Sequence, residues 1–198
     1  MPTPRGSLST FDDAVVAMRG VRLRPELRWD EAPAPSRIAP DAVALTGDVV
    51  SGDDDLATGR LVLLHDTGGH DAWEGTFRLV AYVRADVEPE LAADPLLASV
   101  AWTWLRESLT AREATHHALS GTVTQVSSQG FGGMSDDDPQ TQVEIRASWT
   151  PTDLVEGSPG SGVAAHVVAW SDLLAIAAGL PSVPDGVAPL PTRRRARR

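Results

Sequence analysis

The 198-residue chain contains no cysteine, no lysine and no asparagine. Without lysine it can neither form a Schiff base with a substrate nor hold a nucleotide phosphate through a P-loop lysine. Without cysteine it has no thiol nucleophile, no disulfide, no iron–sulfur cluster and no thiolate-bound zinc. The groups left for catalysis are carboxylates, five histidines, hydroxyls and arginines, and no motif among them defines a reaction. We therefore assign no catalytic, cofactor-binding or metal-binding residue, expect no cofactor, and favour a protein that is not an enzyme.

Positive charge is scarce outside the C-terminus. The formal net charge is −10, but five of the 17 basic residues lie within residues 193–198, which leaves −15 on residues 1–192. Because an acidic surface repels phosphate backbones, we expect no nucleic acid to bind through the folded body. The chain also lacks a hydrophobic run long enough to cross a bilayer, and its first ten residues lack the apolar segment of a signal peptide. We expect a cytoplasmic protein without membrane contact.

The hydrophobic residues recur with two periods, which separate helices from strands. Helical spacing predicts helices at residues 11–19, 95–112 and 163–178. Alternation and β-branched content predict strands at residues 25–31, 42–50, 56–65, 73–84, 115–127 and 141–149, with turns at 51–55 and 66–70. The predicted fold class is α+β, with the order α-β-β-β-β-α-β-β-α. It has one largely antiparallel sheet of about five to six strands, and three helices pack mainly on one face.

The ends of the chain differ from its middle in composition. Residues 1–9 are predicted to be a flexible N-terminus, and residues 10–181 a single α+β domain. Residues 182–198 are predicted to be a proline-rich segment followed by a disordered basic tail.

Tryptophan dominates the aromatic residues, with six against one tyrosine and three phenylalanines. Four of the six lie on apolar stripes and are predicted to form the core between sheet and helices: Trp73, Trp104, Trp149 and Trp170. The positions of Trp29 and Trp102 stay open. An exposed tryptophan marks a contact surface, and we include Trp102 in a candidate binding surface for that reason.

Charged residues gather on the polar faces of two predicted strands. Glu74 and Arg78 share one face, and Glu144 and Arg146 share another. If these strands are neighbours, the four residues form either a patch that recognises a carboxylate or simple cross-strand ion pairs. The glycine-rich segment 128–139 has an apolar tip at Phe131 and Met134, and Phe131 therefore joins the candidate surface.

The histidines define no metal site by their spacing. His65 and His70 flank one predicted turn, where they would either approach each other around a metal or simply reflect turn composition. His116 and His117 are adjacent, so on a strand their side chains point to opposite faces.

Several short sequence segments along the chain resemble those of a known family. They are RPEL at 24–27, ATGRLVLLHD at 57–66, AWEGTFRLVAYVRADVEPE at 72–90, DPLL at 94–97, GTVT at 121–124, VEIRASWTP at 143–151, HVVAW at 166–170 and AGLP at 178–181. Over about residues 11–190 the chain resembles the actinobacterial domain-of-unknown-function family numbered 3000. The resemblance implies a similar size and no assigned activity. The element order is also similar to the secretion-chaperone-like fold of small protein-binding proteins, a likeness of fold that implies no function.

Three functions follow from these patterns. The preferred one is a non-enzymatic protein-binding or regulatory module that uses the sheet edge or the 128–139 loop, with another protein as its partner. The second is an enzyme with a carboxylate and histidine site built from Glu74, Arg78, Glu144 and His65. The third is a small-molecule binder with a tryptophan-lined pocket between helices and sheet.

Overall fold

A computed structural model describes residues 10–51, 54–135, 140–154 and 162–181. The predicted flexible N-terminus at 1–9 and the predicted proline-rich and basic segment at 182–198 lie outside these ranges. No helix in the described ranges is long and apolar enough to cross a membrane.

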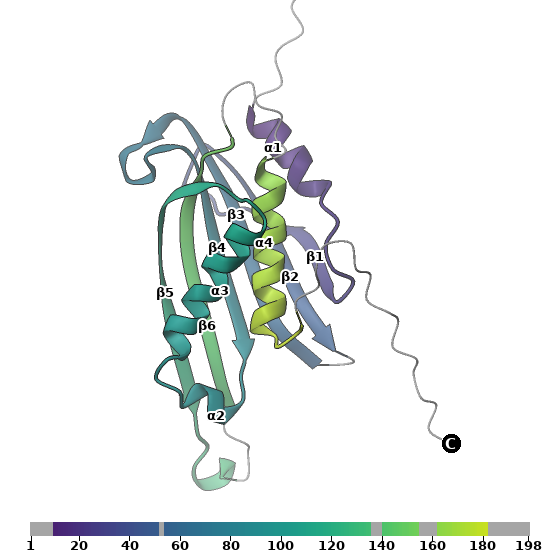
Figure 1. The fold of residues 1–198 in the computed structure, drawn as a ribbon, viewed down its shortest axis with the longest axis vertical. Coiled ribbons are helices and arrows are strands. Elements are labelled where there is room, and N and C mark those ends of the chain that lie inside the picture. Colours follow the sequence, from purple (N-terminus) through teal and green to yellow (C-terminus); the bar gives the residue numbers. More distant parts are fainter. Residues whose placement is uncertain (1–9, 52–53, 136–139, 155–161, 182–198) are drawn as a thin grey trace, which may run out of the picture.

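Six strands form one open antiparallel sheet in the order β1-β2-β3-β4-β6-β5 (Figure 1). They are β1 Leu27–Ala32, β2 Asp41–Ser51, β3 Asp54–His70, β4 Gly75–Asp86, β5 His116–Ser128 and β6 Gln140–Pro151. The helices are α1 Thr10–Arg19, α2 Pro89–Ala92, α3 Leu97–Ala111 and α4 Gly162–Ala177, with 3₁₀ turns η1 Asp71–Trp73 and η2 Gly132–Met134. The α+β class and the predicted element order are confirmed, and α2 is an additional single turn.

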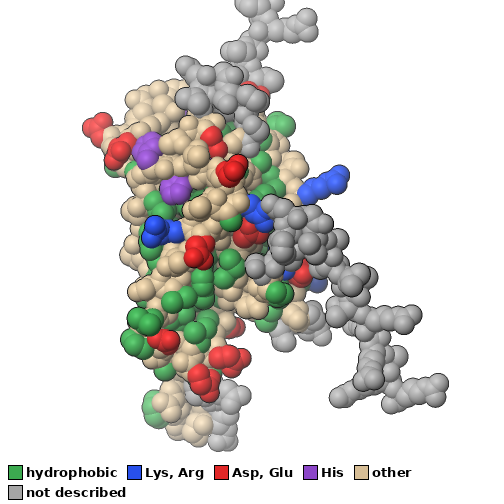
Figure 2. Space-filling view, viewed as in Figure 1, with side chains coloured by type: hydrophobic (Ala, Val, Ile, Leu, Met, Phe, Trp, Pro, Cys, Tyr) green, Lys and Arg blue, Asp and Glu red, His purple; other side chains and the backbone are tan. Residues whose placement is uncertain are grey.

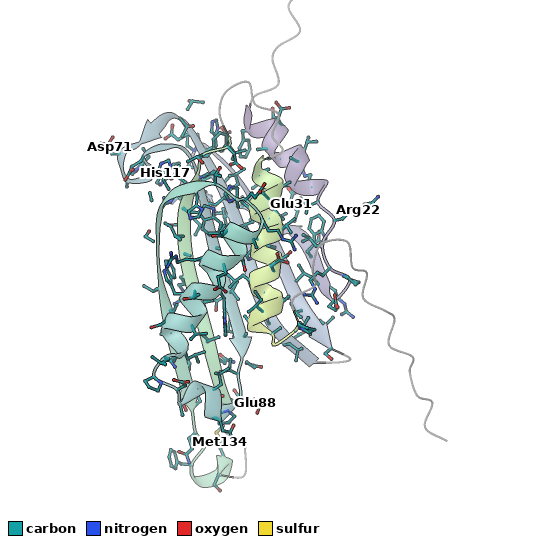
Figure 3. The ribbon with its side chains drawn as sticks, in the orientation of Figure 1. Arg22, Glu31, Asp71, Glu88, His117 and Met134 are labelled. Carbon is teal, nitrogen blue, oxygen red and sulfur yellow. The ribbon has the colours of Figure 1, made fainter. Side chains whose placement is uncertain are left out.

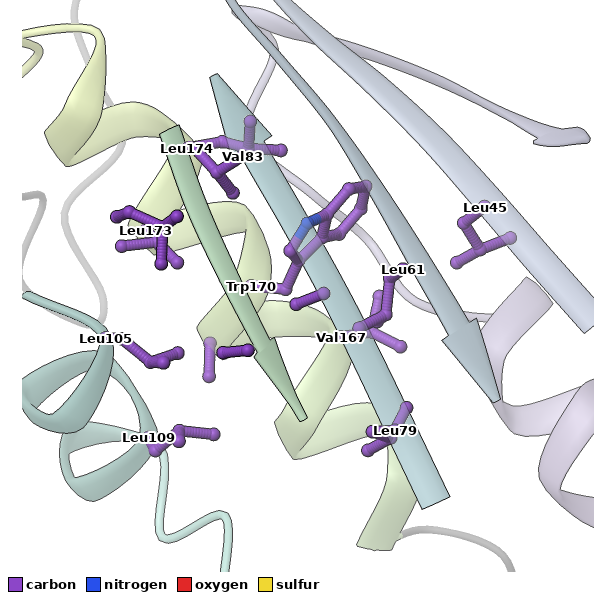
Figure 4. Close-up of a cluster of buried hydrophobic side chains, with 14 of the residues drawn as sticks. Leu45, Leu61, Leu79, Val83, Leu105, Leu109, Val167, Trp170, Leu173 and Leu174 are labelled. Carbon is purple, nitrogen blue, oxygen red and sulfur yellow. The ribbon is translucent and has the colours of Figure 1, made fainter. Parts of the chain in front are cut away.

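The long helices cover one face of the sheet. Helix α4 lies across the central strands, with α1 and α3 packed on either side of it (Figure 1). Because it contacts the sheet and both helices, α4 is buried on nearly all sides, which explains why its sequence is apolar around its whole circumference. Inward residues of β2, β3, β4 and β6 fill the space beneath it around Trp170 (Figure 4).

Glycines allow α4 to approach the strands closely. A Cβ atom on Gly59 of β3 would lie 2.8 Å from Leu174 Cδ2, and one on Gly47 of β2 would lie 3.0 Å from the Trp170 ring. A larger residue at either position would push α4 away from the sheet.

The β3–β4 hairpin differs from its prediction. Residues 66–70 continue strand β3 instead of forming a turn, and the chain reverses through η1, where His70 Nδ1 accepts a hydrogen bond from the Ala72 amide at 3.2 Å. The predicted strand at 73–84 therefore begins at Gly75. Trp73 packs on the face opposite the helices, with Val62 and Leu64, so the prediction that it joins the main core is wrong.

The second predicted helix also starts later than expected. The Asp94 carboxylate accepts a hydrogen bond from the Leu96 amide at 2.8 Å, which closes a turn before α3 begins at Leu97. Trp104 of this helix is only partly buried, at the margin of the core.

Candidate functional site

The sheet face that carries none of the long helices, here called the open face, presents a polar patch from two central strands. Strands β4 and β6 are paired so that Tyr82 lies opposite Arg146 and Arg84 opposite Glu144, and Arg78 contacts Thr150 at the same end of β6 as Trp149. The opposite sides of both strands hold core residues, which follows from the two-residue repeat of a strand. The alternation in the sequence thus places one polar row of each strand on the same surface.

Arg78 is the most unusual residue on this face, because it is a charged side chain that is only 6 % exposed. Its Nη1 donates to Thr150 Oγ1 at 3.0 Å, and its Nη2 donates to Ser148 Oγ at 2.7 Å and to Ser120 Oγ at 3.4 Å. Burial lowers the pKa of the Arg78 guanidinium, and the Glu74 carboxylate raises it. Among the described residues no carboxylate lies within ion-pair distance of Arg78, so neutral hydroxyls alone contact the buried charge.

A bulge in β5 brings Ser120 to this cluster. Ala118 and Leu119 together oppose Trp149 of β6, and Ala118 adopts a φ of 48°. This extra residue sets Ser120 opposite Ser148 and therefore on the open face. Arg78 consequently extends from β4 across β6 to a hydroxyl of β5.

A second cluster lies beside the first on the same face. The Arg146 guanidinium is 2.6 Å from the Glu144 carboxylate and 5.4 Å from the centre of the Tyr82 ring. The Tyr82 hydroxyl donates to Glu144 at 3.2 Å. Burial raises the pKa of the Tyr82 hydroxyl, and the Glu144 carboxylate raises it further, while the Arg84 and Arg146 charges lower it.

Tyr82 provides a spectroscopic test of this cluster, since it is the only tyrosine in the chain. Absorbance at the tyrosinate band should titrate with a midpoint above the ordinary pKa of a tyrosine. Its phenol is held neutral by the fold, so the stability it contributes is present below its unfolded pKa and is lost as the pH rises through its folded pKa. Glu144→Gln should lower the Tyr82 pKa; an unchanged or higher midpoint would contradict the described contact.

The structure brings three of the four predicted charged residues onto one face of neighbouring strands: Arg78, Glu144 and Arg146. Glu74 lies outside the strand, after η1, in a left-handed conformation with φ 55°. Trp102 lies on the helix side, partly buried, with its ring against Gly121 of β5. Phe131 is 77 % exposed at the tip of the β5–β6 hairpin, next to Met134 at 62 % (Figure 3).

One histidine borders this patch: His117 of β5 lies opposite Thr150, and its Nε2 is 3.1 Å from the Glu74 carbonyl oxygen. His65 and His70 lie elsewhere. His65 points to the core side of β3, where its Nδ1 lies 3.1 Å from the Asp41 carboxylate and its ring stacks on Phe11 and Phe77. His70 stacks on Trp73 instead, so the two histidines do not converge. The enzyme site proposed from Glu74, Arg78, Glu144 and His65 is therefore not assembled, because His65 and Arg78 lie on opposite faces. Within the described ranges, no group of three potential ligands could hold a metal ion.

The sequence does not reveal that β5 forms a free edge of the sheet. It is 13 residues long, pairs with β6 on one side, and has no residue that is fully buried. It contains no acidic or basic residue apart from two histidines, and no proline. The other edge strand, β1, is six residues long and carries Arg28, Asp30 and Glu31, the kind of charges that protect edges from pairing. Strand β5 lacks that protection.

A chain of hydrogen bonds that passes through His166 of α4, here called the Trp149–His166–Asp153 relay, was also not predicted. The Trp149 indole N–H donates to His166 Nδ1 at 3.0 Å, and His166 Nε2 lies 3.2 Å from Asp153 Oδ1. Because an indole can only donate, Nδ1 is the accepting nitrogen and the proton sits on Nε2, which donates to Asp153. The relay contains no nucleophile, and we interpret it as structural.

A cavity of about 450 Å³ lies between α3 and α4. Trp104, Ile176 and Leu180 form its apolar wall. The Arg112–Asp172 ion pair, with a 2.6 Å contact, lies at the same cavity. Ser108 also lines it, but its Oγ is buried and has no hydrogen-bond partner in the part of the chain that the structure describes.

Together the fold and the surface define an α+β protein whose open antiparallel sheet has the long helices on one face only and a long edge strand, β5, without acidic residues, arginine or proline. The chain belongs to the DUF3000 family of proteins of unknown function, whose family model matches residues 8–188. The family resemblance inferred from the short sequence segments is thereby confirmed. A search of curated proteins and a search of solved structures found no match to the chain.

Proposed function

We propose that this protein is a binding module that receives an extended segment of a partner protein along the free edge of β5. The observation that carries the proposal is the combination of length, exposure and missing charge in β5. An edge strand offers a row of unpaired backbone N–H and C=O groups, which an added strand can pair. Proteins normally block such edges with charges, proline or bulges. Strand β1 carries such charges, whereas β5 has only the bulge at Ala118 and Leu119 near one end.

The surroundings of β5 support this role. The strand extends from the region of His117 to the hairpin tip near Met134 (Figure 3), so it offers main-chain groups along most of the molecule. Exposed apolar side chains lie near its lower end, both at the hairpin tip and on α2, at the start of α3 and within it: Phe131, Met134, Leu91, Leu96 and Val100. Hydrophobic side chains also gather over this part of the helix side in Figure 2. A partner strand would thus find apolar contacts beside the edge.

The proposal retains the cytoplasmic, non-enzymatic role expected from the sequence, without nucleic acid as a ligand of the folded body. The acidic composition supports that exclusion.

Peptides that carry a single N-methyl group, placed at each position in turn, test strand addition directly. Twelve-residue peptides selected from a random library against the full chain should bind, and N-methylation should then be introduced at each peptide position in turn. In an added strand only every second N–H faces the sheet, so we expect strong loss of binding at alternate positions and little loss between them. Equal tolerance at all positions, or a library that yields no binder, would contradict the proposal.

The cavity between α3 and α4 favours a second candidate, a binder of small apolar molecules. Its volume is within the range of ligand sites, and it has an indole in its wall. A ligand at 100 times its dissociation constant would stabilise the protein by about 2.7 kcal/mol. Thermal unfolding against a metabolite library, repeated on Trp104→Ala, would separate binding in this cavity from binding elsewhere.

A further inference from the structure

We propose that the partner strand carries an aspartate or glutamate opposite Ser120, and that Arg78 binds its carboxylate. This inference rests on the proposed strand addition at β5 and adds to it the chemistry of the partner.

The reach of Arg78 is the first observation. Its Cα belongs to β4, yet its Nη2 lies 3.4 Å from Ser120 Oγ on β5, two strands away. The positive end of the side chain therefore lies beside the edge strand. In an added antiparallel strand, the residue opposite Ser120 has its Cβ about 5 Å from that of Ser120 and points to the same face. A carboxylate on that residue would lie close to the guanidinium.

The second observation is that Arg78 forms no ion pair within the described ranges. Arg78 is 6 % exposed, and within the described ranges it contacts hydroxyl oxygens and no carboxylate oxygen. A guanidinium keeps its charge in proteins, and a buried charge without an ion-pair partner is costly, even with the more distant Glu74 carboxylate acting on it. A carboxylate supplied by the partner would relieve this cost and form charge-assisted hydrogen bonds, which are shorter and stronger than those to hydroxyls.

Two hydroxyls around Arg78 can donate to a ligand as well. Each hydroxyl that accepts from the guanidinium keeps one hydrogen to donate, and Thr150 donates its hydrogen to the Trp73 carbonyl. The hydrogens of Ser120 and Ser148 have no acceptor among the described residues. They can donate to an incoming carboxylate, together with the guanidinium.

The local charge agrees with an acidic ligand even though the chain as a whole is acidic. Glu144, the carboxylate of the neighbouring cluster, is already paired with Arg146 at 2.6 Å. Acidic residues elsewhere on the surface are screened beyond about 10 Å at 0.1 M salt. A side chain near Ser120 therefore senses mainly the Arg78 charge, reduced by the Glu74 carboxylate, which acts on Arg78 electrostatically without forming an ion pair.

The experiment uses the library peptides whose N-methylation pattern shows strand addition. Each acidic residue of a selected peptide is changed to its amide, and binding is measured to the full-length protein and to Arg78→Met. At one acidic position, the change to the amide should weaken peptide binding to the unaltered protein roughly tenfold or more. The same change should have little effect on peptide binding to Arg78→Met. Ser120→Ala should weaken the acidic peptide less, and Arg84→Met, which removes an exposed charge from the same strand and face, should leave the coupling intact.

The outcomes separate the two proposals. Peptides that add to β5 but bind equally well with acid or amide would overturn the role of Arg78 and leave strand addition standing. An acid effect that persists in Arg78→Met, or that Arg84→Met removes equally, would also overturn it. If Arg78→Met fails to fold, the acid-to-amide effect is compared between the unaltered protein and Ser120→Ala. An effect of the same size in both proteins overturns the inference. Absence of strand addition at β5 overturns both proposals.

Discussion

Replacing Trp149 by phenylalanine should destabilise the protein more than replacing Trp170 by phenylalanine. Both tryptophans are fully buried, so both substitutions remove similar apolar volume from the core. They differ in their indole N–H. The Trp149 N–H donates to His166 Nδ1, whereas the Trp170 N–H has no partner among the described residues. Only Trp149→Phe leaves a buried imidazole nitrogen unsatisfied, which costs about 1–3 kcal/mol.

The two variants serve as matched controls for each other in urea unfolding. Both variants replace a buried tryptophan by phenylalanine and so lose the same side-chain volume. The difference between their free energies of unfolding therefore measures the Trp149–His166 hydrogen bond. Equal costs, or a greater cost for Trp170→Phe, would mean that the Trp149–His166–Asp153 relay does not stabilise the fold.

Gly121→Ala should both destabilise the protein and displace β5. A Cβ atom at this position would collide with the Arg146 carbonyl oxygen of β6, and would lie 2.9 Å from both Ala147 Cα and the Trp102 ring. Two of these neighbours are backbone atoms, so the strands must separate to make room. Overpacking of this kind costs roughly 1–3 kcal/mol or more.

Gly133→Ala is the control, because a Cβ there meets no atom within 4 Å. We expect Gly133→Ala to unfold close to the temperature of the unaltered protein and Gly121→Ala to unfold several degrees lower, about 2–4 °C for each kcal/mol in a protein of this size. If both variants unfold at the same temperature, the close approach of β5 to β6 at Gly121 is not as described.

The sequence predicted elements best where one period dominates. Residues 141–149 alternate cleanly, and the structure places Val143, Ile145, Ala147 and Trp149 in the core as the alternation requires. The β3–β4 turn was misplaced because Gly68 and Gly69 resemble turn residues, although they lie within a strand. The hairpin instead reverses where a tertiary contact, Trp73 against Val62 and Leu64, holds it.

The candidate site was harder to predict because it depends on strand order and register. Arg78 and Arg146 could be placed on polar faces by alternation alone. Ser120 meets Arg78 only because of a bulge at Ala118, a residue type with no sequence preference for a positive φ. The edge position of β5 likewise depends on β6 lying between it and β4, which no local pattern indicates.

Amide hydrogen exchange of the full-length protein, with and without a selected peptide, tests the proposed binding edge most directly. If a partner strand pairs with β5, the slowly exchanging amides gained on binding should lie within His116–Ser128, on the side that faces away from β6. The other edge, Leu27–Ala32, should exchange at the same rate in both states. Protection that arises at β1, or binding without new protection in β5, would contradict the assignment of β5 as the edge that receives the partner.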